Sequence, residues 1–194
     1  MSVLSWLSIL NIFVLLASVY LINSPLNKKK SAFSLLITGC LFTYLISNII
    51  YLFDNNLISI LRFLNITTLV CALSALFNLI RESKPIFARF PAILSFLPFT
   101  LLFFVPLILD QLVIYNLIIG TFQGGCIIVA LLIFTLSQFS GKNYKWHILG
   151  TCTALSSFLV FWLSALPEKI LISEVLLAIG ILFLSKGIKE TKLN

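Results

Sequence analysis

The sequence predicts an all-α integral membrane protein, a bundle of about seven transmembrane helices that forms one domain over residues 1–194. Hydrophobic residues make up 60% of the chain and charged residues 10%, and the mean hydropathy is +1.14, far from the averages of soluble domains. The apolar residues fall into separate runs, each long enough to cross a bilayer. The basic residues lie between alternate runs, which predicts an N-terminus outside and a C-terminus in the cytoplasm.

The apolar runs hold roughly 18 to 25 residues each, which matches a hydrocarbon core of about 30 Å. The first run has no basic residue before it and no Ala-x-Ala-like site after it, so we expect it to remain as a helix. Connections of roughly a dozen residues or fewer leave no room for an attached soluble enzyme or DNA-binding domain. The expected spans are residues 3–22, 32–53, 57–80, 90–109, 112–137, 147–166 and 170–186.

The charges of the connections predict which side of the membrane each one occupies. Residues 54–56, 110–111 and 167–169 together hold three acids and one lysine, so the positive-inside rule places them away from the cytoplasm. We therefore expect a multi-pass protein of the inner (cytoplasmic) membrane. Eleven basic residues mark the cytoplasmic side: Lys28, Lys29, Lys30, Arg81, Lys84, Arg89, Lys142, Lys145, Lys186, Lys189 and Lys192.

The net charge of +7 does not indicate a nucleic-acid partner, because the basic residues alternate with apolar runs and form no continuous face. Membrane lipids are the expected partners, with another membrane protein as a second candidate. The cysteines lie singly in separate runs, without a C-x-x-C motif or a nearby histidine at ligand spacing, so we expect small buried apolar residues, no metal site and no cofactor. They are Cys40, Cys71, Cys126 and Cys152.

Two spans contain residues that alter helix geometry or packing. The fourth span contains Pro91, Pro98 and Pro106, for which we expect kinks. The fifth span contains Gly120 and Gly124 in a G-x-x-x-G spacing, followed by Gly125, for which we expect close helix packing. A gate or a dimer face is the alternative interpretation of both features.

Ionisable residues inside a span are costly, so Arg62 and Glu174 are the strongest functional candidates. Both are predicted roughly 7 to 9 Å below the outer surface, at 1.5 Å per residue, and we expect them to form an ion pair. One hypothesis treats this pair as structural, or lets Arg62 extend outward to water. The other is a polar ligand pocket open to the outside, with Ser156 and Ser157 as its floor. The candidate layer is Asn48, Arg62, Asn65, Tyr115, Asn116, Gln123 and Glu174.

Two residue types argue against familiar chemistries. His147 lies at the cytoplasmic start of the sixth span beside Trp146 and Lys145, so we expect an interfacial histidine. The middle of the last span contains no lysine that could form a retinal Schiff base, since Lys169 and Lys186 lie at its two ends. This disfavours a rhodopsin-type pigment.

Four segments carry a family resemblance: 45–55 (LISNIIYLFDN), 69–80 (LVCALSALFNLI), 150–158 (GTCTALSSF) and 178–187 (AIGILFLSKG). Their order resembles that of the YhhN family of lysoplasmalogenases, membrane enzymes that cleave the vinyl-ether bond of lysoplasmalogens with intramembrane acidic residues. That family has eight spans, and this chain resembles it from the second onward. The resemblance implies a related helical fold.

The chain departs from the family at the positions that carry its chemistry. The family has Gly-Asp, His-x-x-Tyr and Ser-Asp at three places. The residues at those places here are Ser47 and Asn48, Ala75 and Asn78, and Ser157 and Phe158. The family's acids and histidine are therefore absent, and the replacements cannot do acid–base work.

Three functions remain open. The first is a YhhN-like lipid-binding or accessory membrane subunit without hydrolase activity, so we lean away from an enzyme. The second is a lipid-modifying hydrolase with Glu174 or Asp54 as its acid and Asn48 or Gln123 as a positioning group. The third is a seven-helix sensor or transporter of small molecules.

Overall fold

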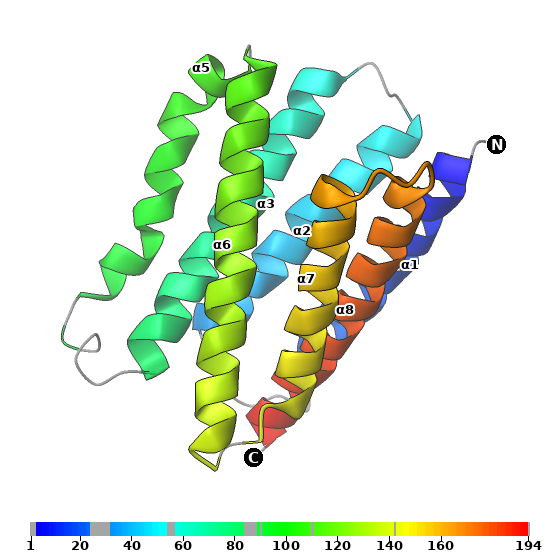
Figure 1. The fold of residues 1–194 in the computed structure, drawn as a ribbon. Helices are drawn as coiled ribbons and strands as arrows, with labels where there is room; N and C mark the ends of the chain where they lie inside the picture. Colours follow the sequence, from blue (N-terminus) through cyan, green and yellow to red (C-terminus); the bar gives the residue numbers. More distant parts are fainter. Residues whose placement is uncertain are drawn as a thin grey trace.

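The computed structural model describes residues 3–23, 32–53, 57–83, 89, 91–109, 111–141 and 143–193, and within these residues it contains helices and no strands (Figure 1). Seven helical segments in this part of the chain are long and apolar enough to cross a membrane. The elements are α1 (Val3–Asn23), α2 (Ala32–Phe53), α3 (Ile58–Ser83), η1 (Ala92–Phe104), α5 (Val105–Leu109), α6 (Leu112–Phe139), α7 (Lys145–Leu163) and α8 (Lys169–Leu193).

The predicted spans agree with these helices in number, order and approximate bounds. The largest difference is in α8, which continues seven residues beyond its predicted end at residue 186 and thus carries Lys186 and Lys189 on its last turns. A helix can end beyond the apolar run because basic residues are good helix formers. Hydropathy marks where the apolar surface ends, and α8 continues past that point.

The fourth apolar segment differs from the prediction of a kinked α-helix. Its first thirteen residues form the 3-10 helix η1, and only the short α5 is an α-helix. Pro98 inside η1 has no N–H for an i to i−4 hydrogen bond, and its ring conflicts with the carbonyl four residues earlier. The N–H of Leu94 instead donates to the Pro91 carbonyl at 3.1 Å, an i to i−3 bond. The prolines therefore tighten the helix along most of its length.

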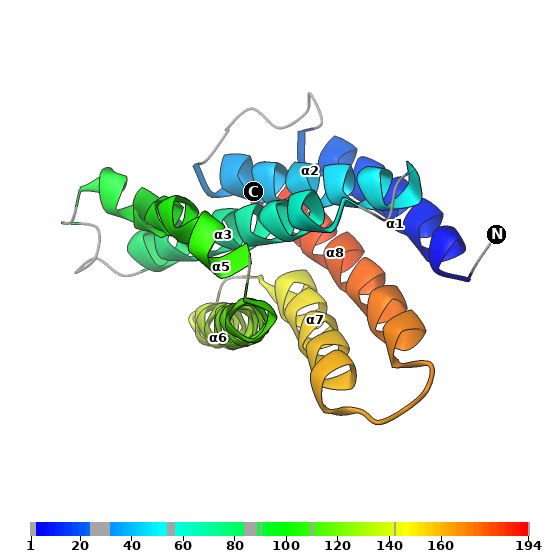
Figure 2. The same cartoon turned by 90° about the horizontal axis from the view of Figure 1, so that it is seen from above.

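The long helices form a closed ring. Going around it, α1 packs against α2, α2 against α3, α3 against α6, α6 against α7, α7 against α8 and α8 against α1. The segment formed by η1 and α5 packs against α3 and α6 outside this ring, as the view along the bundle shows (Figure 2). Buried apolar clusters lie on two sides: α1, α2 and α8 share one, and α3 and α5 share the other.

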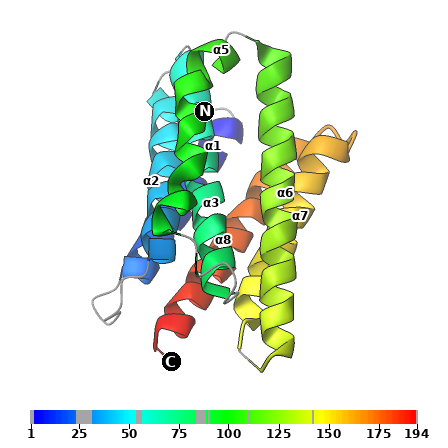
Figure 3. The same ribbon diagram turned by 90° about the vertical axis from the view of Figure 1, so that its left-hand side faces the viewer.

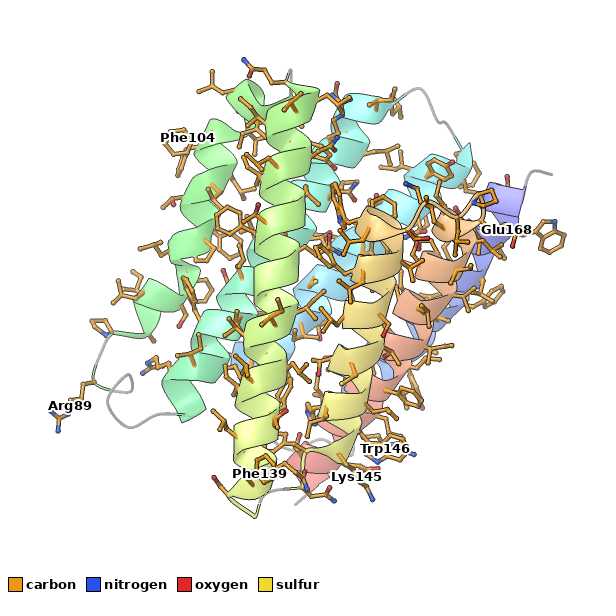
Figure 4. The ribbon with its side chains drawn as sticks, viewed as in Figure 1. Arg89, Phe104, Phe139, Lys145, Trp146 and Glu168 are labelled. Atoms are coloured by element: carbon orange, nitrogen blue, oxygen red, sulfur yellow. The ribbon has the colours of Figure 1, made fainter. Side chains whose placement is uncertain are left out.

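The two ends of the bundle differ in charge. The N-terminus of α1 and the C-terminus of α8 lie at opposite ends (Figure 3). Arg89, Lys145 and Trp146 lie at the end that contains the C-terminus, and Glu168 lies at the other end (Figure 4). The ammonium of Lys186 lies 3.6 Å from the centre of the Trp146 ring. The end that contains the C-terminus thus holds an excess of basic residues, which it shares with Glu190.

The outward surface of the bundle is apolar. Phe53, Phe103, Val113 and Phe139 are each at least 80% exposed. Contiguous apolar surface of this kind is unfavourable in water and favourable against hydrocarbon. The surface and the helix lengths together indicate a multi-pass membrane protein.

The closest helix contact is between α7 and α8. A Cβ atom added to Gly150 would lie 2.8 Å from the backbone nitrogen of Leu184 and 2.9 Å from the carbonyl oxygen of Gly180. Because neither Gly150 nor Gly180 has a side chain, the two backbones approach closely. The close approach strengthens van der Waals packing, which holds membrane helices together because no hydrophobic effect operates between them. This contact was not predicted, because Gly150 and Gly180 lie in different spans.

The predicted glycine packing in α6 is confirmed at two of three positions. A Cβ atom at Gly120 would lie 3.3 Å from the Trp162 ring, and one at Gly124 would lie 2.7 Å from the Phe158 ring, so both glycines receive aromatic side chains of α7. A Cβ atom at Gly125 would meet no atom within 4 Å. The G-x-x-x-G spacing therefore serves contact within the bundle, between α6 and α7.

We predict that Gly150→Val destabilises the protein by about 1–3 kcal/mol, because the added atoms would force the α7 and α8 backbones apart. The measurement is the free energy of unfolding in mixed micelles. Gly125→Val is the matched control: it has the same change in helix propensity, an open environment, and an expected effect below about 0.5 kcal/mol. Equal losses in the two variants would contradict the close contact.

Candidate functional site

A cavity of about 490 Å³ lies inside the helix ring, between α2, α3, α6, α7 and α8. Its lining on α6 runs from Tyr115 to Phe134, which is roughly 28 Å of helix, and on α3 from Asn65 to Leu79, roughly 21 Å. The cavity is therefore elongated along the bundle axis. Its volume lies within the range of small-molecule pockets, roughly 300–1,000 Å³.

The polarity of the lining changes along the cavity. Toward the end that contains Glu168, Glu174 lines it together with Asn65 and Asn116, and Gln123 lies about two turns further along α6. The middle is mostly apolar, with hydroxyl groups from residues such as Thr68 and Ser157, and the opposite end contains His147. The apolar residues of the middle are Leu69, Ala72, Cys126, Ile127, Ala130, Leu177 and Ile181.

Glu174 is held by two hydrogen bonds to the same oxygen atom. The amide of Asn11 on α1 donates to Glu174 Oε2 at 2.7 Å, and the hydroxyl of Tyr44 on α2 donates to Oε2 at 3.0 Å. The described residues provide no hydrogen bond to Oε1 of this cavity-lining carboxylate. Glu174 therefore presents one oriented oxygen that is still able to accept a hydrogen bond.

The predicted ion pair between Arg62 and Glu174 is wrong. The Arg62 guanidinium donates from Nη1 to the carbonyl oxygen of Leu109 at 2.8 Å and lies 5.6 Å from the centre of the Tyr115 ring. It thus satisfies a terminal carbonyl of α5, and it does not line the cavity. The physical reason is the ring order: α8 packs between α7 and α1, whereas α3 faces α2, α6 and η1. Arg62 and Glu174 were predicted at similar depth, but their helices, α3 and α8, do not face each other.

Five of the seven predicted layer residues line the cavity: Asn65, Tyr115, Asn116, Gln123 and Glu174. The two exceptions are Arg62 and Asn48, whose amide donates to the backbone oxygen of Tyr44 on its own helix at 2.9 Å. Asn65 connects α3 to α6, because its amide nitrogen donates to the Tyr115 hydroxyl at 3.1 Å. The structure therefore brings five residues of the predicted layer to one cavity and places Arg62 and Asn48 outside its lining.

The predicted floor of the pocket is half correct. Ser157 lines the cavity, and its hydroxyl donates to the carbonyl oxygen of Ser173 on α8 at 2.7 Å. Ser156 is exposed, and its hydroxyl donates to the Cys152 carbonyl within α7. Adjacent residues of a helix point about 100° apart, so both serines could not face the same cavity.

Two residues of this site were missed from the sequence. Asn11 and Tyr44 are the partners of Glu174, and neither belonged to the predicted layer. Both are polar side chains about nine residues from the ends of α1 and α2 that lie toward Glu168, at about 12 to 14 Å from those ends by helix rise. A search for polar groups by depth in every span, including the first, would have found them.

His147 is buried, which corrects the prediction of an interfacial histidine. It is 2% exposed, and its Nδ1 atom has no hydrogen-bond partner among the described residues. Its ring lies 4.7 Å from the Phe134 ring and 5.0 Å from the Tyr144 ring between centroids. Gly187 provides the space for it, since a Cβ atom there would lie 2.6 Å from Nδ1. The histidine lines the cavity toward the end that contains the C-terminus.

The cysteines occupy three environments. Cys71 is buried as predicted, Cys40 and Cys126 are partly buried and line the cavity, and Cys152 is exposed on the outside of α7, contrary to the prediction. Within the described residues, no group of three or more histidine, cysteine or acidic side chains is placed to hold a metal ion. The polar chemistry of the cavity therefore rests on Glu174, the amides and His147.

Comparison with known proteins places the chain in no family: no family model, curated protein or solved structure matches it. The resemblance to the YhhN family remains a prediction. The geometry of the cavity is accordingly the basis for the function proposed below.

We predict that Asn11 and Glu174 are energetically coupled and that Arg62 and Glu174 are not. In double-mutant cycles with Asn11→Leu and Glu174→Leu, the coupling should be about 0.6–1.7 kcal/mol, the range of hydrogen bonds between membrane helices. The cycle of Arg62→Leu with Glu174→Leu should be additive within about 0.5 kcal/mol. Unfolding free energies in mixed micelles provide both values, and the reverse pattern would restore the ion pair.

Proposed function

We propose that this protein is a lipid-binding protein of the inner membrane that holds an amphipathic molecule in the cavity inside its helix ring. The observation that carries the proposal is the distribution of polarity: an elongated apolar cavity ends at an oriented carboxylate with a free oxygen atom. An apolar chain fits the middle, and a polar group fits the Glu174 end. A mostly apolar lining with few placed polar groups is typical of ligand pockets.

The dimensions of the cavity favour a single chain. A volume of about 490 Å³ spread over the roughly 21 Å lined by α3 gives a mean cross-section of about 23 Å². A uniform channel of this cross-section would be about 4.8 Å on a side, so the cavity is narrow for its length. One acyl chain reaches about half of a 30 Å hydrocarbon core, so the cavity accommodates its full length.

Binding without catalysis agrees with the side chains at the positions of the YhhN resemblance. Ala75 lines the cavity but has no functional group, and Phe158 stands where that family has an acid. Asn48 hydrogen-bonds to its own helix. None of these can transfer a proton, which supports a binding role over a hydrolase.

The orientation that we propose places the Glu168 end outside and the Lys145 end in the cytoplasm. The support is the excess of basic residues at the end that contains the C-terminus: Arg89 and Lys145 lie there (Figure 4), and the last turns of α8 carry Lys186 and Lys189. Basic residues are retained on the cytoplasmic side of inner-membrane proteins. Glu174 then lies in the outer half of the membrane, so the polar group of the ligand is held there.

We predict that filling the cavity removes a co-purifying amphipathic molecule. Ala130→Trp places an indole into the apolar middle, whereas Ile128→Trp, on the same helix, replaces a side chain that is 48% exposed outside the bundle. Native mass spectrometry of gently solubilised protein should detect the bound molecule in wild type and Ile128→Trp. In Ala130→Trp its occupancy should fall at least tenfold. Equal occupancy of the bound molecule in all three proteins would contradict the proposal.

We predict that the two ends of the bundle react from opposite sides. In a cysteine-free background, Glu168→Cys should react with a membrane-impermeant maleimide in intact cells, and Gly141→Cys should react only after the membrane is opened. Both positions are exposed in short connections, so accessibility to reagent is matched. The opposite labelling pattern would reverse the proposed orientation.

A further inference from the structure

Resting on the proposed function, we infer that the polar group of the bound molecule is a cation, an ammonium group attached to an apolar chain. The site that selects it consists of the free oxygen of Glu174 and the aromatic rings around that end of the cavity. The charges that face the cavity are the first support for this inference.

The lining has a single fixed charge. Among the described residues that line the cavity, Glu174 is the only aspartate or glutamate, and none is lysine or arginine. Arg62 lies behind Tyr115 and donates to the Leu109 carbonyl, so its charge is used within the protein wall. An anionic group in this cavity would meet a carboxylate and no basic side chain. A cation would meet its opposite charge in a region of low dielectric constant, where the attraction is strong.

The carboxylate is prepared for such a ligand. Asn11 and Tyr44 both donate to Oε2, which fixes the plane of the carboxyl group and leaves Oε1 for an incoming donor. A fixed acceptor loses little freedom on binding, so the interaction is stronger than one with a mobile side chain. The asymmetry between the two oxygen atoms is therefore the feature expected of a ligand site.

Aromatic rings occupy the same level of the bundle. The Ser157 hydroxyl donates to the Ser173 carbonyl, so Phe158 and Glu174, the residues that follow each of these, lie at matching heights on α7 and α8. Trp162 lies one turn further toward the Glu168 end and also lines the cavity, with its ring 6.3 Å from the Phe158 ring. Aromatic faces attract ammonium groups, most strongly when water is excluded. The carboxylate and the rings thus favour the same chemical class.

This ammonium chemistry has two sources, an aminophospholipid of the membrane or a free hydrophobic amine. The first arm of the test places the protein in nanodiscs that contain phosphatidylethanolamine and phosphatidylglycerol and identifies the lipids retained after extraction. The second arm titrates delipidated protein in neutral detergent with dodecylammonium, dodecyl phosphate and dodecanol. All three probes have the same chain, so differences report the polar group alone.

In the second arm, wild type should bind dodecylammonium at least tenfold more tightly than dodecanol or dodecyl phosphate. Glu174→Gln should lose this preference while still binding dodecanol, because the amide oxygen of the substituted side chain can still accept from Asn11 and Tyr44. Glu168→Gln, which removes the same charge at an exposed position outside the cavity, should behave as wild type. Trp162→Leu is the second variant and should weaken ammonium binding by a smaller factor, about three- to tenfold.

The outcomes separate the two claims. Retention of phosphatidylethanolamine that depends on Glu174 identifies a lipid source, and ammonium binding in the second arm alone identifies a free amine; both support the inference. Equal binding of the three probes, or an unchanged preference in both Glu174→Gln and Trp162→Leu, overturns it and leaves the proposed chain-binding function intact. Binding of no probe, or binding that Ala130→Trp does not reduce, overturns the proposed function itself.

Discussion

The carboxylate of Glu174 connects three helices through one oxygen atom, and the rest of the site depends on this connection. Asn11 on α1 and Tyr44 on α2 both donate to it, so α8 is joined to two neighbours that are distant in sequence. An isolated carboxylate in hydrocarbon would be strongly unfavourable, and hydrogen bonds from buried donors offset that cost. Because both donors use the same oxygen, the interaction orders the bundle and leaves the other oxygen to the cavity.

The packing on the other side of α8 relies mainly on backbone contact. Gly150 and Gly180 bring the α7 and α8 backbones into van der Waals contact, and the Ser157 hydroxyl adds a hydrogen bond to the Ser173 carbonyl. The contact between α6 and α7 is wider, because the rings of Trp162 and Phe158 lie on Gly120 and Gly124, respectively. Aromatic side chains fill more space than a backbone contact does. The spacing of α6 from α7 and α8 is consistent with the open volume between them.

The two ends of the cavity have different linings. Toward the Glu168 end, polar side chains from α3, α6 and α8 approach each other, and Asn65 hydrogen-bonds to Tyr115 across two helices. At the other end, His147 packs against the rings of Phe134 and Tyr144. It also lies against Gly187, which has no side chain to occupy the same space. A molecule with one polar end and one apolar chain has a preferred direction in such a cavity. The same asymmetry motivates the search for a ligand that carries one charged group.

The sequence by itself determined the helical class, the number and approximate bounds of the apolar segments, and the difference in charge between the two ends. These properties are local, because run length and charge are read along one segment at a time. It also placed Glu174, Asn65 and Arg62 at comparable depths. Only the tertiary structure decided which of them face each other, because depth comes from position along a helix, whereas partners come from the order of helices around the ring. For that reason Arg62 binds the Leu109 carbonyl, Glu174 binds Asn11 and Tyr44, and the cavity lies between helices that no hydropathy pattern could pair.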